Sequence, residues 1–351
     1  MALFSVPNVQ LKGLAVSVPA NTEDNMQLEL FTQPERELFV KTVGIRYRRV
    51  AAKEVTAADL CFSAANKLLT EMNWQRHEVS VLIFITQTPD YIIPNTSSLL
   101  QEKLGLSKSC LVFDVNLGCS GYVYGLSVIS SLLQNIPNGK GLLLVGDVST
   151  AVISKNDRST TPLFSDAGSA TALVNTGAGV MHFNLQTDGK EYDDIIVPDG
   201  GFRNKTNTES FIEREVEKGI CRSNLDMKLD GVKIFNFALR EVAPNVNALL
   251  QTYSIAKEDI DCFVMHQANL LMLESVRKKL QVPAEKFPYS LYHFGNTSSA
   301  TIPLTMLVKE NRKLSSEKAK WLLSGFGVGL SWGSVYLETE NVTCLPLIEI
   351  K

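Results

Sequence analysis

Cys119 has the surroundings that nucleophilic chemistry requires. It lies in the segment DVNLGCSGYVYGL, where an apolar, strand-like run gives way to a helix-like one. Gly118 and Gly121 permit a tight and sterically open turn, and the amide groups of a first helical turn favour the thiolate form. We therefore expect a nucleophile that faces a crevice. The competing interpretation is a small buried hydrophobe, which is the commoner role of a free cysteine.

The other cysteines are expected to be structural. They are Cys61, Cys110, Cys221, Cys262 and Cys344. No two cysteines have the C-x-x-C spacing, and no run of cysteine and histidine has the spacing of zinc ligands. The sequence therefore predicts no metal site.

A histidine and an asparagine occupy comparable positions in the second half of the chain. His266 opens the segment HQAN directly after the apolar run DCFVM, and Asn296 lies in HFGNTSSA after a glycine. Side chains at the carboxyl ends of strands in an α/β sheet face the crevice in which ligands bind. We therefore expect both to reach the crevice of Cys119. The alternatives are a satisfied structural histidine and an asparagine that caps a turn or a helix.

Three alternating glycines follow the last long apolar run, in GFGVGLSWG at residues 325–333. A dinucleotide-binding fingerprint requires a helix after its glycines, whereas the residues SWGSVYLE have the pattern of a strand. We therefore expect a backbone turn whose amide groups stabilise a developing oxyanion.

Strand-length apolar runs alternate with segments of helical periodicity, which is the pattern of an α/β fold. In the first half, strands are expected at residues 81–86, 110–115 and 141–146, and helices at 95–104 and 121–133. In the second half, strands are expected at 261–265, 289–293 and 320–324, and helices at 270–280 and 299–310.

The two halves repeat this order, which indicates an internal duplication. Thr86 and His266 are 180 residues apart, and Cys119 and Asn296 are 177 residues apart, so equivalent strand ends keep a nearly constant separation. The alternative is that two unrelated α/β halves share a similar order and spacing of strands and helices. The expected organisation is a first half at residues 1–180, a connecting lobe or insertion at 181–230 and a second half at 231–351.

The composition is that of an ordinary globular protein, with 351 residues, of which 45% are hydrophobic and 20% charged. A net charge of −3 disfavours a nucleic-acid-binding surface. No stretch approaches the ~18 consecutive apolar residues of a membrane span, and the chain does not begin with the pattern of a signal peptide. We therefore expect a cytoplasmic protein that binds neither nucleic acid nor membrane.

Taken together, the motifs resemble those of β-ketoacyl-acyl-carrier-protein synthase III, a condensing enzyme of the thiolase superfamily. The resemblance extends from about Gly44 to Gly333, through DVNLGCSG, DRSTTPLFSDAGSA, HQAN, GNTSSA and GFGVGLSWG. It implies a duplicated βαβαβαββ fold in five αβαβα layers and a homodimer. It also implies that Cys119, His266 and Asn296 form the catalytic trio.

The resemblance implies a reaction as well. Cys119 takes an acyl group from acyl-coenzyme A or acyl-carrier protein, and the backbone amides of Cys119 and Val328 form the oxyanion hole. His266 and Asn296 donate hydrogen bonds to a malonyl thioester, so that loss of CO₂ leaves a stabilised enolate. The enolate carbon then attacks the acyl-cysteine and gives a β-ketoacyl thioester. No metal or other cofactor is required.

Further residue roles follow from the resemblance alone. Those expected to bind substrate are Arg158, Phe164, Gly231, Phe235 and Asn269, and those expected to dock the carrier protein are Arg277, Lys278 and Lys279. A solvated helix face is the simpler interpretation of the three basic residues.

Ile93 is expected to influence the length of the acyl chain. In the resembling family the residue before this proline reaches across the dimer interface and closes the partner's acyl pocket. Because Ile93 is smaller than the phenylalanine that suits an acetyl primer, we expect a preference for longer primers. The alternative is simple interface packing.

The chain departs from the family pattern where many members hold the nucleotide of coenzyme A. Leu38 and Thr42 stand in place of a tryptophan and an arginine, and Leu271 replaces a basic residue used in carrier-protein docking. These departures favour a specialised pathway.

An acyltransferase that moves the acyl group from Cys119 to an alcohol or amine is the main alternative function. Such relatives usually lack one member of the decarboxylating pair, whereas His266 and Asn296 are both present. The intact trio also disfavours a non-catalytic scaffold. A non-decarboxylating thiolase would need a second cysteine near the GFGVG turn, which has none.

Overall fold

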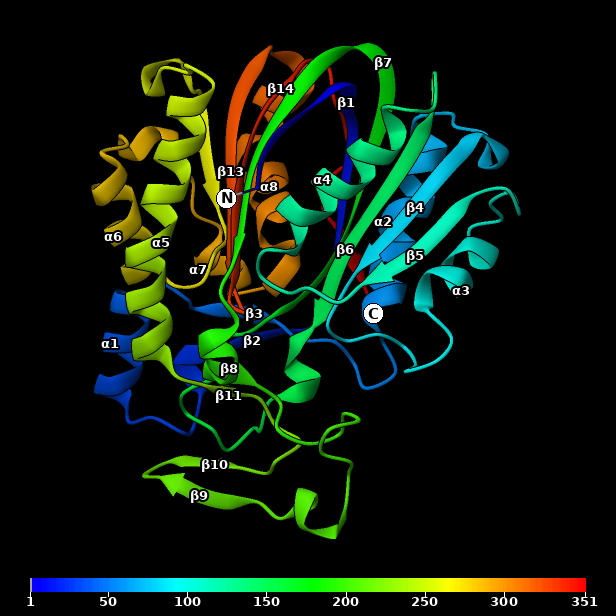
Figure 1. Ribbon diagram of the computed structural model, residues 1–351. Helices are drawn as coiled ribbons and strands as arrows, with labels where there is room; N and C mark the ends of the chain where they lie inside the picture. Colours follow the sequence, from blue (N-terminus) through cyan, green and yellow to red (C-terminus); the bar gives the residue numbers. More distant parts are fainter. Residues whose placement is uncertain (1) are drawn as a thin grey trace.

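Residues 2–351 are described by a computed structural model in which helices and strands alternate along most of the chain (Figure 1). The α-helices are α1 (Gln33–Val43), α2 (Ala57–Glu71), α3 (Thr96–Lys103), α4 (Gly121–Leu133), α5 (Gly231–Thr252), α6 (Leu270–Leu280), α7 (Leu291–Phe294) and α8 (Thr301–Ser316). The longer strands are β1 (Ala2–Pro19), β4 (Val79–Ile85), β5 (Leu111–Val115), β6 (Lys140–Val148), β7 (Asp166–Thr187), β12 (Cys262–Met265), β13 (Ala319–Gly327) and β14 (Ser331–Thr339). The shorter strands are β2 (Thr22–Asp24), β3 (Tyr47–Arg49), β8 (Ile195–Ile196), β9 (Arg214–Glu217), β10 (Ile220–Arg222), β11 (Lys228–Leu229), β15 (Thr343–Cys344) and β16 (Ile348–Ile350).

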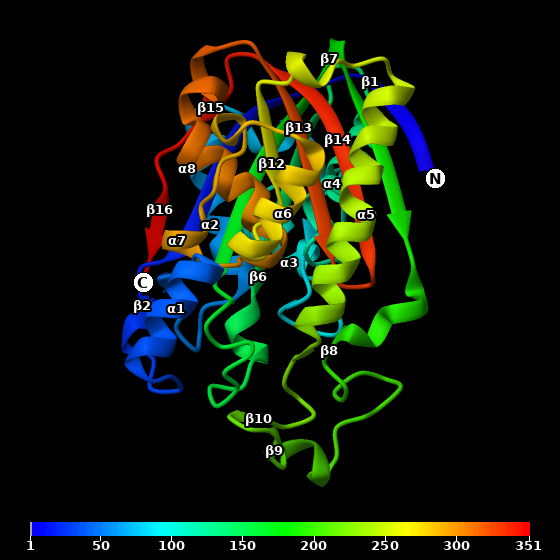
Figure 2. The same cartoon turned by 90° about the vertical axis from the view of Figure 1, so that its left-hand side faces the viewer.

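These elements stack in the predicted αβαβα order. Helices α4 and α8 lie in the middle and contact strands of both halves, while α5 and α6 cover one outer face and α2 and α3 the other (Figures 1 and 2). Nine residues of α4 are buried, as expected for a helix with sheet on both sides. The central layer therefore holds the helix that begins beside Cys119.

The longer strands other than β1 form one hydrogen-bonded ladder in the order β12-β13-β14-β7-β6-β4-β5. The first part of β7 pairs with β6, and its last part pairs with β14. Strand β1 runs antiparallel along both parts. Two long strands thus join the two halves, and the predicted boundary at residue 180 falls within β7. The division into domains stays a prediction.

Most predicted elements are confirmed. Helices α4 and α6 have the predicted bounds, and the strands at 81–86, 110–115, 141–146, 261–265 and 320–324 correspond to β4, β5, β6, β12 and β13. The predicted helix at 299–310 begins with a short 3-10 turn, Ser298–Ala300, and continues as α8.

The predicted strand at 289–293 is wrong, because this segment leads into the short helix α7. The buried residues Leu291 and Phe294 are three positions apart, which is the spacing of one helical face. In addition, the amide of Ser290 donates to the side chain of Gln267 at 3.1 Å instead of to a neighbouring strand. The second half therefore has no counterpart of β5 here.

The segment after β7 forms a lobe of short elements. Strand β8 pairs with β11, and β9 pairs with β10 in a hairpin that projects away from the layers (Figure 2). The lobe leaves Phe202 and Phe211 exposed, whereas Ile195 is buried against the body of the protein. One side of this lobe thus contributes to the interior.

Candidate active site

Cys119 lies at the junction of the two halves. It follows β5 and precedes α4, and it is 8% exposed. The end of β13 packs directly against it: a Cβ atom on Gly327 would lie 2.8 Å from Sγ of Cys119, and one on Gly325 would lie 2.9 Å from its carbonyl oxygen. Real Cβ atoms essentially never come within 3.0 Å of another heavy atom. Gly325 and Gly327 therefore allow close packing on the cysteine.

The Cys119 thiol is not activated in the way that the sequence suggested. Burial raises its pKa to about 11, and hydrogen bonds from the backbone of Val328 and of Cys119 itself lower the pKa only in part. Desolvation therefore outweighs the helix N-terminus, and the expected resting thiolate is corrected to a thiol. Contact with the amide of Val328 also puts the sulfur beside one of the two predicted oxyanion donors.

His266 is buried directly after β12. The residue is 2% exposed, and its Nδ1 lies 2.8 Å from the hydroxyl oxygen of Thr301. Burial lowers the pKa of His266 to about 3, although a hydrogen bond with the backbone of Ser298 opposes this shift. The imidazole is therefore neutral at physiological pH.

Asn296 has a fixed orientation. Its backbone amide donates to the carbonyl of Leu163 at 2.9 Å, and its carbonyl accepts from the amide of Ser165 at 2.9 Å. Its side-chain oxygen accepts from the amide of Ser298 at 2.9 Å. Because the oxygen is engaged, the NH₂ group is the part of the side chain that is free to donate.

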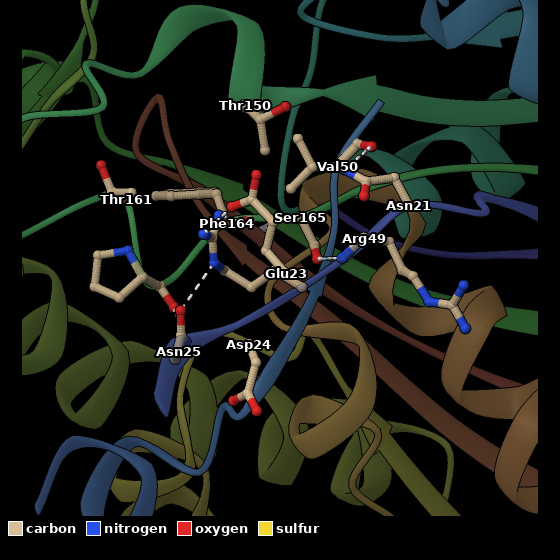
Figure 3. Close-up of polar contacts among 12 residues, drawn as sticks. Asn21, Glu23, Asp24, Asn25, Arg49, Val50, Thr150, Thr161, Phe164 and Ser165 are labelled. Atoms are coloured by element: carbon tan, nitrogen blue, oxygen red, sulfur yellow. Dashed lines mark hydrogen bonds and ion pairs between the residues drawn. The ribbon is translucent and has the colours of Figure 1, made fainter. Parts of the chain in front are cut away.

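The loop that holds Asn296 is itself anchored to the N-terminal region. Figure 3 shows the Ser165 hydroxyl facing the backbone of Arg49, whose amide donates to it at 2.6 Å. On the other side of Phe164, the Asn25 side chain donates to the carbonyl of Pro162 at 2.9 Å. Phe164 and Asn296 are thereby held in register as an isolated β-bridge.

Two cavities meet at Cys119 and Phe164. One, of about 160 Å³, is lined by His266 and Asn296 together with Cys119. The other, of about 310 Å³, is lined by Cys119 and Val328. The structure thus brings all three predicted catalytic residues to one cavity, with a second space beyond the sulfur.

The other predicted substrate residues are distributed unevenly. Gly231 and Asn269 line the smaller cavity, whereas Phe235 lines neither. Asn269 also caps α6, since its side-chain oxygen accepts from the amide of Met272 at 2.8 Å. Its NH₂ group remains available for a ligand.

Arg158 is already engaged by neighbouring residues. Its guanidinium donates to Glu35 at 2.9 Å and lies 4.7 Å from the ring centroid of Phe31. Glu35 also caps α1 by accepting from Thr32, and this backbone contact, followed by the bond from Arg158, lowers its pKa to about 2. A substrate would have to compete for Arg158.

The predicted docking residues lie at the end of α6. Arg277 is paired with Glu274 at 2.8 Å, and Nζ of Lys279 donates to the carbonyl of Leu239. Leu271, at the start of the helix, is 59% exposed. Ile93 is also exposed, at 83%, and does not line either cavity of its own chain.

Comparison with known proteins points to one family. Residues 113–189 match the family described as 3-Oxoacyl-[acyl-carrier-protein (ACP)] synthase III, and residues 250–339 match its C-terminal domain. The β-ketoacyl-[acyl-carrier-protein] synthase III of Syntrophomonas wolfei is 32% identical over 333 residues, covering 94% of this chain and 97% of the relative.

The chain belongs to the 3-oxoacyl-[acyl-carrier-protein] synthase III family. Solved structures agree. A 3-oxoacyl-(acyl-carrier protein) synthase from Burkholderia xenovorans LB400 is 37% identical with a TM-score of 0.93, and each chain is covered to 99%. The synthase III of Pseudomonas aeruginosa PAO1 is 27% identical with a TM-score of 0.81, covering 97% of this chain and 100% of the other.

Membership in the synthase III family confirms the predicted fold class and class of reaction. The protein is an acyltransferase of the condensing type, which forms a β-ketoacyl thioester by decarboxylative condensation. Within residues 2–351, no three His, Cys, Asp or Glu side chains gather as a metal site would require. None of the helices in this range has the length and apolar character needed to cross a membrane.

Several residues that shape this synthase site were missed by sequence reasoning. Ile195 and Met227 of the lobe line the larger cavity, whereas the sequence predicts only a connecting lobe or insertion there. Ser298 and Thr301 contact Asn296 and His266 from within the GNTSSAT segment. The density of hydroxyl side chains in that segment was the available signal.

The charge states predict a simple pH dependence. With pKa values of about 3 and about 11, His266 stays neutral and Cys119 stays mostly protonated between about pH 5 and about pH 9. We expect malonyl decarboxylation to be flat over this range. Acylation of Cys119 should accelerate with pH, because the thiolate fraction rises about tenfold per unit below the pKa.

Radiolabelled CO₂ release and intact-protein mass spectrometry, followed at each pH, measure the two steps separately. An inflection of decarboxylation near neutral pH would contradict the neutral state of His266. An acylation rate that does not rise with pH would contradict the raised pKa of Cys119.

Proposed function

We propose that Cys119, His266 and Asn296 carry out the two half-reactions of this condensing enzyme. The observation that carries the proposal is their convergence on one cavity, with the sulfur at the boundary of a second cavity. A site divided in this way suits an acyl group on one side of the sulfur and a thioester carrier on the other.

In the first half-reaction, Sγ of Cys119 attacks the carbonyl carbon of an acyl thioester. The amides of Cys119 and Val328 stabilise the negative oxygen of the tetrahedral intermediate. The carbon–sulfur bond to the donor then breaks, and the departing thiol carries away the proton lost by Cys119. The larger cavity, with Ile195 and Met227 on its wall, would receive the acyl chain.

In the second half-reaction, His266 and Asn296 bind the thioester carbonyl of a malonyl group. As the bond to CO₂ breaks, its electron pair moves towards that carbonyl and forms an enolate. Two buried neutral donors stabilise the developing charge because they are aimed at it before it forms. The enolate carbon attacks the acyl carbonyl, and the Cys119 thiolate leaves and is reprotonated.

Substitution at Asn296 should separate the half-reactions. We expect Asn296→Ala to slow malonyl decarboxylation on the order of 10²–10³ fold, as for the loss of one oxyanion donor. Acylation of Cys119, followed by intact-protein mass spectrometry, should survive. Cys119→Ala should take up no acyl mass.

Cys262→Ala is the matched control, because Cys262 is buried in β12 and lines neither cavity. It should acylate as the wild type does. Acylation that persists in Cys119→Ala, or an Asn296→Ala variant that condenses normally, would overturn the assigned roles.

The donor for the first half-reaction is proposed to be acyl-coenzyme A or acyl-carrier protein. Both carry the acyl group as a thioester at the end of the same type of flexible arm. They differ at the other end of that arm, which is a nucleotide in coenzyme A and a protein in acyl-carrier protein. The pairing of Arg158 with Glu35 and Phe31 at that outer side opposes binding of a coenzyme A nucleotide. The carrier protein is therefore the favoured donor; its docking on α6 would have to use Lys278, because Arg277 and Lys279 are engaged within the chain.

Replacing Glu35 tests this preference. Glu35→Gln keeps the helix cap, which accepts Glu or Gln, but removes the charge that holds Arg158. We expect KM for an acyl-coenzyme A donor to fall by about two- to fivefold, the size of an exposed ion pair. KM for the same acyl group on a carrier protein should not change.

Glu37→Gln is the control, because Glu37 lies on the same helix but pairs with Gln33 instead of Arg158. An unchanged KM for coenzyme A in Glu35→Gln would show that Arg158 does not contact this donor. A parallel change for both donors would have the same meaning.

A homodimer is proposed from the resemblance and from one exposed edge. Strand β5 ends the ladder, and its residue Leu111 is 49% exposed. Tyr91 and Ile92, which directly precede Ile93, are exposed at 57% and 74%. An apolar strand edge of this kind favours pairing with another chain. Ile93 would then belong to the partner's acyl cavity.

The location in the cytoplasm stays a prediction.

The length of the primer tests the position of Ile93. Each additional buried methylene contributes about 0.8 kcal/mol, so a larger cavity favours longer chains. We expect wild-type acylation to prefer donors longer than acetyl, and Ile93→Phe to shift the preference towards acetyl. Acylation rates for donors of two to about ten carbons measure both profiles. A wild type that prefers acetyl, or identical profiles, would contradict the assignment.

A further inference from the structure

The hydroxyl of Thr301 contacts the far side of the His266 ring. Thr301 begins α8 and is 1% exposed, and its Oγ1 lies 2.8 Å from Nδ1 of the imidazole. The contact is buried, so water does not replace it. The direction of this hydrogen bond therefore determines which ring nitrogen of His266 carries the proton.

A neutral imidazole carries one proton, on either Nδ1 or Nε2. The hydrogen bond made by one nitrogen therefore decides whether the other nitrogen is protonated. If Thr301 donates to Nδ1, the proton of His266 is on Nε2. If His266 donates from Nδ1, its Nε2 presents a lone pair instead. Since the pKa of His266 is about 3, a doubly protonated ring does not compete near neutral pH.

The choice depends on a single hydroxyl proton. Oγ1 of Thr301 has two acceptors within reach, Nδ1 of His266 at 2.8 Å and the carbonyl of Ser298 at 3.0 Å. The Ser298 carbonyl already accepts the backbone amide of Thr301 in the turn before α8. It therefore does not depend on the hydroxyl. The backbone of Ser298 also contacts the ring and would accept from a ring N–H, so both arrangements satisfy the buried groups. Only donation from Oγ1 to Nδ1 leaves a proton on Nε2 for a thioester carbonyl.

We propose that Thr301 is a positioning residue, which donates its hydroxyl proton to Nδ1 and thereby keeps the proton of His266 on Nε2. This inference rests on the proposed function, in which His266 acts as a donor. Nε2–H can then hydrogen-bond to the thioester carbonyl. A lone pair at the same place would face the growing negative charge and oppose decarboxylation.

The same segment orients the second donor by the same means. The amide of Ser298 occupies the side-chain oxygen of Asn296, which leaves its NH₂ group to face a ligand. Ser298 adopts a φ of +51°, which is uncommon outside glycine and asparagine and turns the chain between the two contacts. One short turn thus determines the direction of two proton donors.

Two substitutions at Thr301 test the inference. Thr301→Val keeps the shape but has no proton to donate, so the ring should place its own proton on Nδ1 and bond to the Ser298 carbonyl. We expect malonyl decarboxylation to fall on the order of 10² fold, as for the loss of one oxyanion donor. Acylation of Cys119 should be retained, and Thr301→Ser should restore decarboxylation to near the wild-type rate.

The tautomer itself is measured by nitrogen-15 NMR of the wild-type protein labelled at its four histidines. The His266 signals are assigned by their absence in His266→Ala. We expect a protonated Nε2 and an unprotonated Nδ1 in the wild type, and the reverse in Thr301→Val. This measurement decides the matter even where Thr301→Val folds poorly.

The outcomes separate this inference from the proposed function. Wild-type His266 protonated on Nδ1, or a Thr301→Val variant that decarboxylates within about twofold of the wild type, would overturn the role of Thr301. If His266→Ala itself decarboxylated normally, the proposed role of His266 would fail instead, whatever the tautomer.

Discussion

The site depends on the close approach of a strand end from the second half to a helix start from the first. Gly325 and Gly327 lie so near Cys119 that a methyl group on either would overlap its carbonyl or its sulfur. This approach brings the amide of Val328 to the sulfur, at the point where the two cavities meet. Larger residues here would move Val328 away from the sulfur, and Cys119 would lose the backbone contact that lowers its pKa.

Burial then determines how the chemistry is done. Desolvation keeps Cys119 as a thiol and His266 as a neutral imidazole, so the resting site holds few charges. Asp147, also buried, accepts from the amide of Gln87 at 2.7 Å and from the hydroxyl of Ser299 at 2.5 Å, and it links the two halves at the wall of the larger cavity. In the proposed mechanism, negative charge develops only when substrate reacts, and the neutral side chains of His266 and Asn296 then stabilise it.

The sequence was informative where one local pattern determines the outcome. Strong periodicity predicted the bounds of α4 and α6, and strand ends predicted that Cys119, His266 and Asn296 lie together. It was uninformative where distant groups decide. The Cys119 pKa depends on desolvation, and the pair between Glu35 and Arg158 joins residues 123 positions apart. Neither the desolvation of Cys119 nor this long-range ion pair can be predicted from the spacing of residues along the sequence.

A single-turnover experiment tests the condensing function most directly. Protein acylated at Cys119 with a labelled acyl group is mixed with a malonyl thioester, and CO₂ release and loss of the acyl mass are followed in the same reaction. Condensation predicts one CO₂ for each acyl group lost, with all of the label in a β-ketoacyl thioester. Label that leaves with water, an alcohol or an amine, without release of CO₂, would contradict the proposed mechanism.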